Sequence, residues 1–350
     1  MVRSRNTIAT PPGFTIKEQL VDRGMSQKEF AARMALSEKH VSRLINGEVQ
    51  LTPDVAIRLE MVLGIPAKFW NNLEAIYREK LERVNQENEM DEDIELVKKF
   101  PYKEMVKYGW VESTLRAEDR VISLRKHFEV VRLTLVNQSG ITRIACRRTA
   151  ETEKADYALL AWAQQAKIEA RQRKTMPINI EKLVSELPAI REMTCMDPSE
   201  FCPKLIASLA DCGIALVFLP HIGGSFLHGA SFYDGNKIVL GLTVRGRDAD
   251  KFWFSLFHEL GHIVLGHISQ IEGTSDADEA NADLFARNHL IPLSPFNEFV
   301  LSGQITREAI ISFAKDIGID VGIVVGRLQK EGYLHYNWFN DLKTKYEIKS

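Results

Sequence analysis

Apolar side chains recur every three to four positions along residues 14–84, in short runs separated by helix-breaking or helix-capping residues. Glu29 stands three residues after Ser26, which is the spacing of a capping box at the start of a helix. The residues that open or close the runs are Gly24, Ser26, Ser37, Gly47, Thr52, Pro53, Gly64 and Pro66. The pattern predicts five short helices, the last of which continues into a charge-dense linker over residues 79–95.

The second pattern begins after residue 212. Residues 100–211 keep helical spacing and indicate a scaffold, whereas residues 214–219 form an apolar run typical of a buried strand. A turn at Asp234-Gly235-Asn236 predicts a hairpin. Its strands and the helices that follow are expected at 228–233, 237–242, 251–268, 278–290 and, as short helices, within 306–346. We therefore divide the chain into 1–84, 85–199, 200–295 and 296–350.

Composition adds little to this picture. The net charge is −2 and the hydrophobic content 45%, both ordinary for a globular protein. Residues 1–84 hold 13 Lys or Arg and 10 Asp or Glu, a net charge of +3, which weakly favours nucleic acid as a partner of this end. We expect a cytoplasmic protein, because residues 1–12 lack a secretory signal. We expect no membrane partner, because no apolar run is long enough to span a bilayer. The four cysteines form no CxxC pair and are expected to be free thiols.

Two of the predicted helices have the features of a helix-turn-helix. The first, over 27–34, offers Ala31 as the small residue at a close helix crossing. The apolar side chains predicted to pin the pair to a core are Phe30, Met34, Leu36, Val41 and Leu44. The residues left on the exposed face of the second helix are Ser37, Glu38, Lys39, Ser42 and Arg43. Arg43 or Lys39 could contact guanine edges or phosphates. Ser26 and Gln27, at a helix N-terminus, are natural phosphate contacts.

The segment from Met25 to Tyr77 resembles the XRE-type helix-turn-helix family and is most similar to its HigA-like antitoxin branch, which often ends in a comparable Trp-Asn-Leu-x-x-x-Tyr element, here Trp70 to Tyr77. The resemblance implies a double-stranded DNA operator as partner and a homodimer. Ala35 stands where the family usually has Gly, so we expect an alanine with positive φ. A small helical bundle that only dimerises or binds protein is the alternative.

The strongest chemical motif is HELGH at residues 258–262. His258 and His262, four residues apart, lie about 40° apart around a helix and roughly 6 Å along it, so both imidazoles can bind one zinc ion. Glu259 between them is placed to act as a general base. The preceding residues 252–257 are largely apolar, which makes a chance surface occurrence of the motif less favoured.

A third zinc ligand is expected from a second helix. His267 would face away from His258 if the helix continued, so we interpret it as a helix-end histidine. Glu279 is the better candidate ligand, and Asp283, one turn later, could hold a ligand imidazole through its ring N–H. Asp276 and Asp278 are rival ligands that are less well placed. Taken alone, the acids of this helix would be explained as partners of the helix dipole.

These residues together resemble the ImmA/IrrE family of metallopeptidases, through FHELGHIVLGH at 257–267 and EANADLFARNHLIP at 279–292. The resemblance implies a multidomain fold, in which the all-α helix-turn-helix domain is followed by an α+β zincin-like metallopeptidase domain with a small sheet and helical surroundings. It implies Zn²⁺ bound by His258, His262 and Glu279, with Glu259 as general base. Candidates for stabilising an oxyanion are His221, His228 and Tyr233, and the strand at 237–242 could offer an edge to a substrate peptide.

The leading hypothesis is a DNA-binding transcriptional regulator that carries a zinc-dependent endopeptidase domain. This domain would cleave a regulatory protein, either a partner repressor or antitoxin or the chain itself within residues 79–95. The alternative is a catalytically silent HigA-like antitoxin or repressor, whose metal domain only senses a ligand or docks a toxin or other partner. An intact HExxH motif favours the first hypothesis. A digestive peptidase is disfavoured by the absence of a secretory signal and by the DNA-binding domain.

Overall fold

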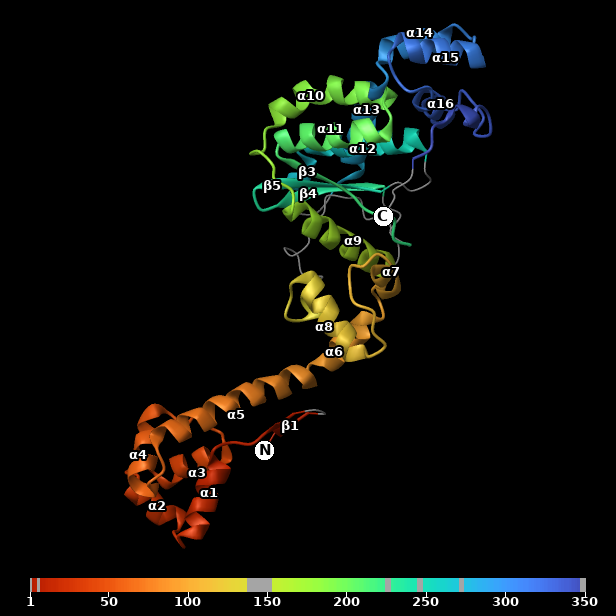
Figure 1. Ribbon diagram of the computed structural model, residues 1–350. Coiled ribbons are helices and arrows are strands. Elements are labelled where there is room, and N and C mark those ends of the chain that lie inside the picture. Colours follow the sequence, from red (N-terminus) through yellow and green to blue (C-terminus); the bar gives the residue numbers. More distant parts are fainter. Residues whose placement is uncertain are drawn as a thin grey trace. The chain divides into compact units, whose positions relative to one another are not determined.

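A computed structural model describes residues 2–4, 7–136, 153–223, 228–243, 248–270 and 274–346. The chain divides into two compact units, Met1–Ile94 and Glu95–Ser350 (Figure 1). Of the four cysteines, Cys195, Cys202 and Cys212 are free thiols, as expected, and Cys146 lies outside the described residues. Within the described ranges, no helix combines the length and apolar character needed to span a membrane.

The first unit contains the five predicted helices: α1 (Gly13–Asp22), α2 (Gln27–Arg33), α3 (Glu38–Asn46), α4 (Pro53–Leu63) and α5 (Ala67–Asn88). The hydroxyls of Ser26, Ser37 and Thr52 cap α2, α3 and α4 by accepting hydrogen bonds from backbone N–H groups three residues on. The predicted capping box at Ser26 is only half formed, because the Glu29 carboxylate pairs with Arg33 at 2.7 Å.

The core of this unit confirms the helix-turn-helix packing. Its buried members include the crossing residue Ala31 and the predicted pins Phe30, Met34, Val41 and Leu44. The sequence did not predict the small antiparallel pair of β1 (Val2–Arg3) and β2 (Ile8–Ala9), because two-residue strands are too short to show alternation.

The boundary between the units lies ten residues later than the predicted limit of 84. Helix α5 extends to Asn88, as the predicted helix end over residues 79–95 requires, and α6 (Met90–Val97) follows after one residue. Val84 is fully buried with Ala9 and Tyr77, which explains why this part of α5 belongs to the first unit. The structure also groups residues 95–350 as one unit, whereas three parts were predicted, because one core runs from Leu183 to Tyr346.

The second unit is mainly helical and contains one three-stranded sheet. Its other helices are α7 (Tyr102–Lys107), α8 (Ala117–Phe128), α9 (Glu153–Arg171), α10 (Ile180–Glu192), α11 (Pro198–Asp211), α12 (Ala249–Val264), α13 (Asp276–Leu290), α14 (Leu293–Leu301), α15 (Arg307–Asp316) and α16 (Val321–Lys330). The strands are β3 (Ile214–Phe218), β4 (Gly229–Asp234) and β5 (Lys237–Leu242). The predicted hairpin at Gly235-Asn236 joins β4 to β5.

The sheet has the order β3-β5-β4, with β3 parallel and β4 antiparallel to β5. Alternate side chains pack on opposite faces: Leu240 joins the core shared with α12, and Val239 joins the core shared with α9. Figure 1 shows these two helices on opposite sides of the sheet. Gly241 makes room for Trp162 of α9, since a Cβ there would lie 2.5 Å from its ring. The prediction that residues 237–242 form a free edge is wrong, because β5 is paired on both sides.

Helices α12 and α13 pack closely against each other. Gly261 lies at their crossing, where a Cβ would stand 3.1 Å from the ring of Phe285. Helix α12 ends at Val264, four residues before its predicted end, because Gly266 adopts a left-handed conformation with φ 77°. The chain then continues into the short 3₁₀ helix His267–Ser269.

Candidate functional site

The predicted DNA-contacting residues share one feature: all are exposed. The set comprises Ser26, Gln27, Ser37, Glu38, Lys39, Ser42 and Arg43. Helix α3, which carries the last four, buries Val41, Leu44 and Ile45 on its opposite face. Arg43 makes only a loose ion pair with Glu48, at 3.6 Å. The side chains of α3 that face away from the core are therefore available to a ligand.

The turn between α2 and α3 is tight, as the sequence predicted. Ala35 has a positive φ of 51°, which costs an alanine conformational energy that glycine would not pay. Arg58 of α4 donates a hydrogen bond to the Met34 carbonyl at 3.0 Å and so satisfies the end of α2. The angle between the two helices is thus held by a backbone turn and by a third helix.

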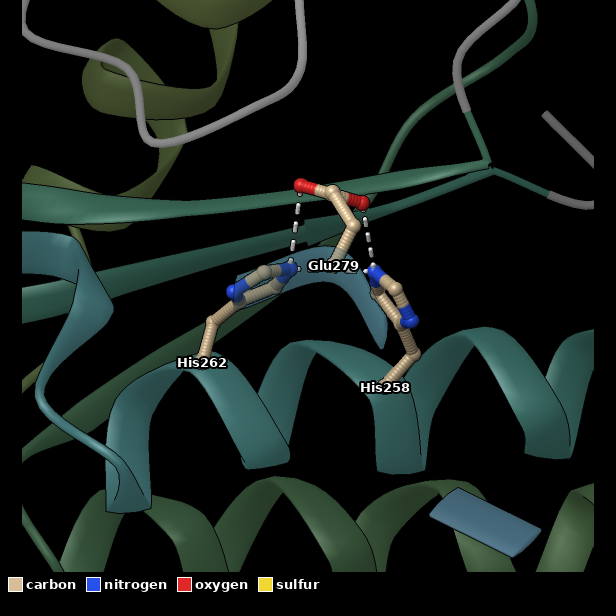
Figure 2. Close-up of side chains that lie close together, drawn as sticks. All are labelled: His258, His262 and Glu279. Atoms are coloured by element: carbon tan, nitrogen blue, oxygen red, sulfur yellow. Dashed lines mark hydrogen bonds and ion pairs between the residues drawn. The ribbon is translucent and has the colours of Figure 1, made fainter. Parts of the chain in front are cut away.

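Three side chains of the second unit converge on one point (Figure 2). The Nε2 atoms of His258 and His262, on successive turns of α12, lie 3.0 Å apart. The carboxylate of Glu279 points between them from α13, with one oxygen 3.4 Å from Nε2 of His258 and the other 3.5 Å from Nε2 of His262. Among the described residues, these three form the group able to hold a metal ion, and Asp276 and Asp278 are not part of it.

The distances fit a tetrahedral ion. Ligand atoms about 2.0–2.1 Å from a zinc ion in tetrahedral geometry lie about 3.3 Å from one another. The two Nε2 atoms are 3.0 Å apart, and each lies 3.4–3.5 Å from a different oxygen of the Glu279 carboxylate, so the separations are of this size. Two imidazole nitrogens and one carboxylate oxygen also form a donor set that zinc prefers. The three predicted ligands therefore fit a zinc ion in number, chemistry and spacing.

Asp283 holds one of the two rings, as predicted. Its Oδ1 lies 2.9 Å from Nδ1 of His258, and its Oδ2 lies 3.4 Å from Lys330 Nζ. Burial lowers the pKa of His258, but hydrogen bonds to Asp283 and Glu279 outweigh burial and raise it to about 10. The hydrogen bond with His258 lowers the pKa of Asp283 to about 2. The carboxylates thus stabilise positive charge where the rings meet.

The other ring is held by a residue that the sequence placed elsewhere. His267 was expected to face away, but Gly266 ends the helix and returns His267 to the side of His262, with 3.0 Å between the two Nδ1 atoms. Nε2 of His267 in turn lies 3.3 Å from Oδ1 of Asp278. Burial and the adjacent His258 lower the pKa of His262 to about 4, so this ring is neutral.

Glu259 is a buried acid beside the cluster, 6% exposed. Burial raises the pKa of its carboxyl group to about 7. Ser231 on β4 donates a hydrogen bond to Oε2 of Glu259 at 2.7 Å. Gly229 leaves space for the Glu259 side chain, because a Cβ there would lie 2.9 Å from its Cγ. The sequence analysis did not identify Ser231. Its alternation with Ala230 and Phe232 puts it on the α12 side of the sheet, but only the assembled fold reveals its partner.

A cleft of about 920 Å³ lies against the helix that carries the two histidines, and none of the three converging residues lines it. Phe254 and Ser255, one turn before His258 on α12, line it together with His228, which precedes β4. Of the three residues considered for an oxyanion, His228 is therefore the one beside this cleft. Tyr233 is half exposed near the far end of β4, and the backbone carbonyl of His221 accepts a hydrogen bond from Tyr108 at 3.1 Å. The sequence also missed Thr274, whose hydroxyl donates to Glu279 at 2.6 Å.

Comparisons with known proteins identify the first unit. A family model described as "Helix-turn-helix" matches residues 16–70. An uncharacterised HTH-type transcriptional regulator of Escherichia coli strain K12, YddM, is 40% identical over 63 residues, which cover 18% of this chain and 67% of that protein. A solved structure of an addiction module antidote protein of the HigA family, from Coxiella burnetii, is 27% identical and covers 24% of this chain and 92% of that one, with a TM-score of 0.22.

The family model and the match to YddM agree with the buried packing of α2 against α3 and with the exposed polar face of α3. By its helix-turn-helix at residues 16–70, the chain belongs to the DNA-binding HTH-type transcriptional regulators.

Proposed function

We propose that this chain is a transcriptional regulator whose second unit is a zinc-dependent endopeptidase that cleaves another regulatory protein. The observation that carries the proposal is the convergence of His258, His262 and Glu279 within 3.0–3.5 Å of one another. The likeness of residues 257–267 and 279–292 to the ImmA/IrrE metallopeptidases supports the same reaction. Zinc held there would supply Lewis acidity, which makes water and a peptide carbonyl more reactive.

Glu259 is the residue suited to move the proton. With a pKa of about 7, its carboxylate can accept a proton from water near neutral pH and return it to the amide nitrogen that leaves. Ser231 fixes Oε2 of this carboxylate, which leaves Oε1 for proton transfer. Burial excludes bulk water from the carboxylate and keeps its pKa close to the working pH.

The shape of the surroundings favours a peptide as substrate. One edge of β4 pairs with β5, and in the described part of the sheet no strand covers its other edge. A peptide in extended conformation can add to such an edge through backbone hydrogen bonds. The cleft beside Phe254 and Ser255 would accept its side chains next to His258.

A separate protein is favoured over the chain itself as the substrate. Residues 79–95, considered above for self-cleavage, lie in α5 and α6. Glu87 near the end of α5 accepts a hydrogen bond from Thr7 at 2.8 Å, and Val84 is fully buried. A protease binds its substrate extended, so cutting here would first require this helix to unfold. Cleavage of a partner repressor or antitoxin would not require any helix of this chain to unfold.

The same proposal includes a homodimer on an operator. Ile57 and Met61, one turn apart on α4, are 50% and 79% exposed, which leaves an apolar strip outside the helix-turn-helix core. Two copies would present two α3 helices to a two-fold DNA site. Light scattering of the full chain gives the mass that tests this part, and a monomer at micromolar concentration with and without operator DNA would contradict it.

Replacing Glu259 by Gln tests the proposed reaction. Zinc-loaded full chain is incubated with a complex mixture of bacterial peptides, and mass spectrometry counts the new termini. We expect zinc content to stay unchanged and cleavage to fall at least about 100-fold, because the base is lost while the ligands remain. Glu181→Gln, an exposed position at the start of α10, is the matched control and should cleave as the wild type does.

Two outcomes would overturn the proposal. Cleavage that persists in the Glu259→Gln variant would remove the role of this carboxylate. Zinc-loaded wild-type chain that cuts neither the peptide mixture nor any purified repressor would point instead to a metal domain that senses a ligand or docks a partner.

A further inference from the structure

We propose that Asp278, acting through His267, is a positioning residue for the metal ligand His262, and that the same carboxylate fixes the helix that presents Glu279. This inference rests on the zinc site of the proposed function. It assigns roles to two side chains that are not ligands. One acid would then set the positions of ligands on two different helices.

The contacts form a continuous chain from the carboxylate to the ligand. Oδ1 of Asp278 lies 3.3 Å from Nε2 of His267, and Nδ1 of His267 lies 3.0 Å from Nδ1 of His262. Both histidines are buried, at 7% and 1% exposure. Because few water molecules can reach these ring nitrogens, each needs its partner in the protein.

The direction of the protons follows from the acid at one end. The carboxylate of Asp278, 3.3 Å from Nε2 of His267, favours the tautomer of His267 with its proton on Nε2, which leaves the Nδ1 lone pair as an acceptor. That lone pair accepts the Nδ1–H of His262, so Nε2 of His262 also carries a lone pair. Asp283 likewise holds a proton on Nδ1 of His258, so a cation that binds at Nε2 displaces only the proton of that nitrogen. Both Nε2 atoms can then bind one cation.

The second oxygen of Asp278 performs a different task. Its Oδ2 accepts hydrogen bonds from the backbone N–H of Ser275 at 2.8 Å and from the Ser275 hydroxyl at 2.7 Å. This is the capping box that starts α13, and the next residue is Glu279. The contacts with Ser275 lower the pKa of Asp278, and Gln270 contributes further to this. The helix start that positions the third ligand is therefore tied to the histidine that orients the second.

We call the series of contacts from Asp278 through His267 to His262 the relay. Two substitutions of His267, whose new side chains have the same number of non-hydrogen atoms, test it. In His267→Asn the side-chain carbonyl can take the place of Nδ1 and accept the hydrogen bond from His262, whereas His267→Leu offers no acceptor. Zinc affinity of the full chain is measured by competition with a chromophoric chelator, and the visible spectrum of the Co²⁺-loaded protein reports the ligand geometry. We expect a loss of roughly 10–100-fold for His267→Leu and a loss below about fivefold for His267→Asn.

Substitutions at the acid separate its two roles. Asp278→Asn keeps the size but removes the charge that sets the proton direction, and should also weaken zinc binding about 10-fold or more. Ser275→Ala removes the hydroxyl half of the capping box and leaves the contact of Asp278 with His267, so it should change zinc affinity less than Asp278→Asn does. Circular dichroism at each step confirms that the variants are folded.

The results discriminate between this inference and the proposed function. Wild-type affinity in His267→Leu, or equal losses in the Leu and Asn variants, would overturn the relay while leaving a zinc peptidase intact. A wild-type chain that binds no zinc would overturn both. A chain that binds zinc and follows the expected order of variants, yet cleaves nothing, would support the relay and contradict only the peptidase.

Discussion

The two functional regions of this molecule are built in opposite ways. The helix-turn-helix presents residues that lie within 18 positions of one another in the sequence, from Ser26 to Arg43, and all of its predicted contact residues are exposed. The candidate metal site draws on α12, α13 and β4, and its ring nitrogens and carboxylates are largely buried. An exposed surface needs only correctly placed helices. A buried polar site needs a partner for every atom, so it recruits residues from distant parts of the chain.

Removing a ligand should produce the largest effect and should leave the first unit untouched. We expect His262→Ala to lower zinc affinity roughly 1000-fold, since each ligand contributes a large share of the binding free energy. Operator affinity should not change, because the helix-turn-helix lies in another compact unit. Chelator competition and a DNA-binding titration on the same sample measure both. His335→Ala, at an exposed position, is the control; a variant at 262 that retains full affinity would break the assignment.

A substitution in the core of the first unit should destabilise that unit and leave the metal site intact. Trp70 is fully buried and its indole N–H donates to the Ile65 carbonyl at 3.2 Å. Trp70→Ala should lower the free energy of unfolding of this unit by about 3–5 kcal/mol, because it creates a large cavity. The adjacent Phe69, 45% exposed, is the matched control, and Phe69→Ala should cost less than about 1.5 kcal/mol. Calorimetry should show an earlier first transition with zinc content preserved; loss of zinc would show that the two units depend on each other.

A surface contact should have a smaller effect that depends on salt. Arg43→Ala should weaken operator binding by about 1–3 kcal/mol. It should also lower by about one the slope of log affinity against log salt concentration, because one cationic side chain no longer neutralises a phosphate. Fluorescence anisotropy across a series of salt concentrations measures both quantities. Arg83→Ala, on α5 beyond the matched residues 16–70, should leave both unchanged. Equal effects at 43 and 83 would mean that α3 is not the reading helix.

The smallest expected effect concerns the turn between α2 and α3. Ala35→Gly should stabilise the first unit by about 0.5–1 kcal/mol, because glycine adopts the positive φ of 51° without strain. Ala32→Gly, inside α2, should destabilise it by a similar amount. Urea titration followed by tryptophan fluorescence distinguishes the two. A loss of stability in both variants would contradict the strained turn.

The same contrast explains what the sequence could predict. Caps at Ser26, Ser37 and Thr52 and the positive φ of Ala35 are local, so they were found from neighbouring residues. The convergence of His258, His262 and Glu279 was also predicted, because two of them lie one helical turn apart and the third opens the next helix. The structure supplied Ser231, whose contact with Glu259 spans 28 positions and a sheet.

Two errors have the same physical origin. The angle assigned to His267 assumed that α12 continues through Gly266, whereas this glycine ends the helix. The strand at 237–242 was considered as an edge, but strand order depends on the parallel pairing with β3, which no local pattern encodes. Both features follow from tertiary contacts, which helical or alternating periodicity does not describe.

Gly261 has a consequence for how tightly this site can retain an ion. The two imidazoles lie one helical turn apart, so the regular geometry of α12 sets their spacing and packing against other helices has little influence on it. The third donor depends on how near α13 approaches, and only a hydrogen atom separates residue 261 from Phe285. A methyl group at this position would push α13 away from α12. Glu279 would move with α13, whereas both histidines would stay in place on α12. Natural variation at a residue that binds nothing could thereby loosen or tighten metal retention while the HExxH motif stays intact.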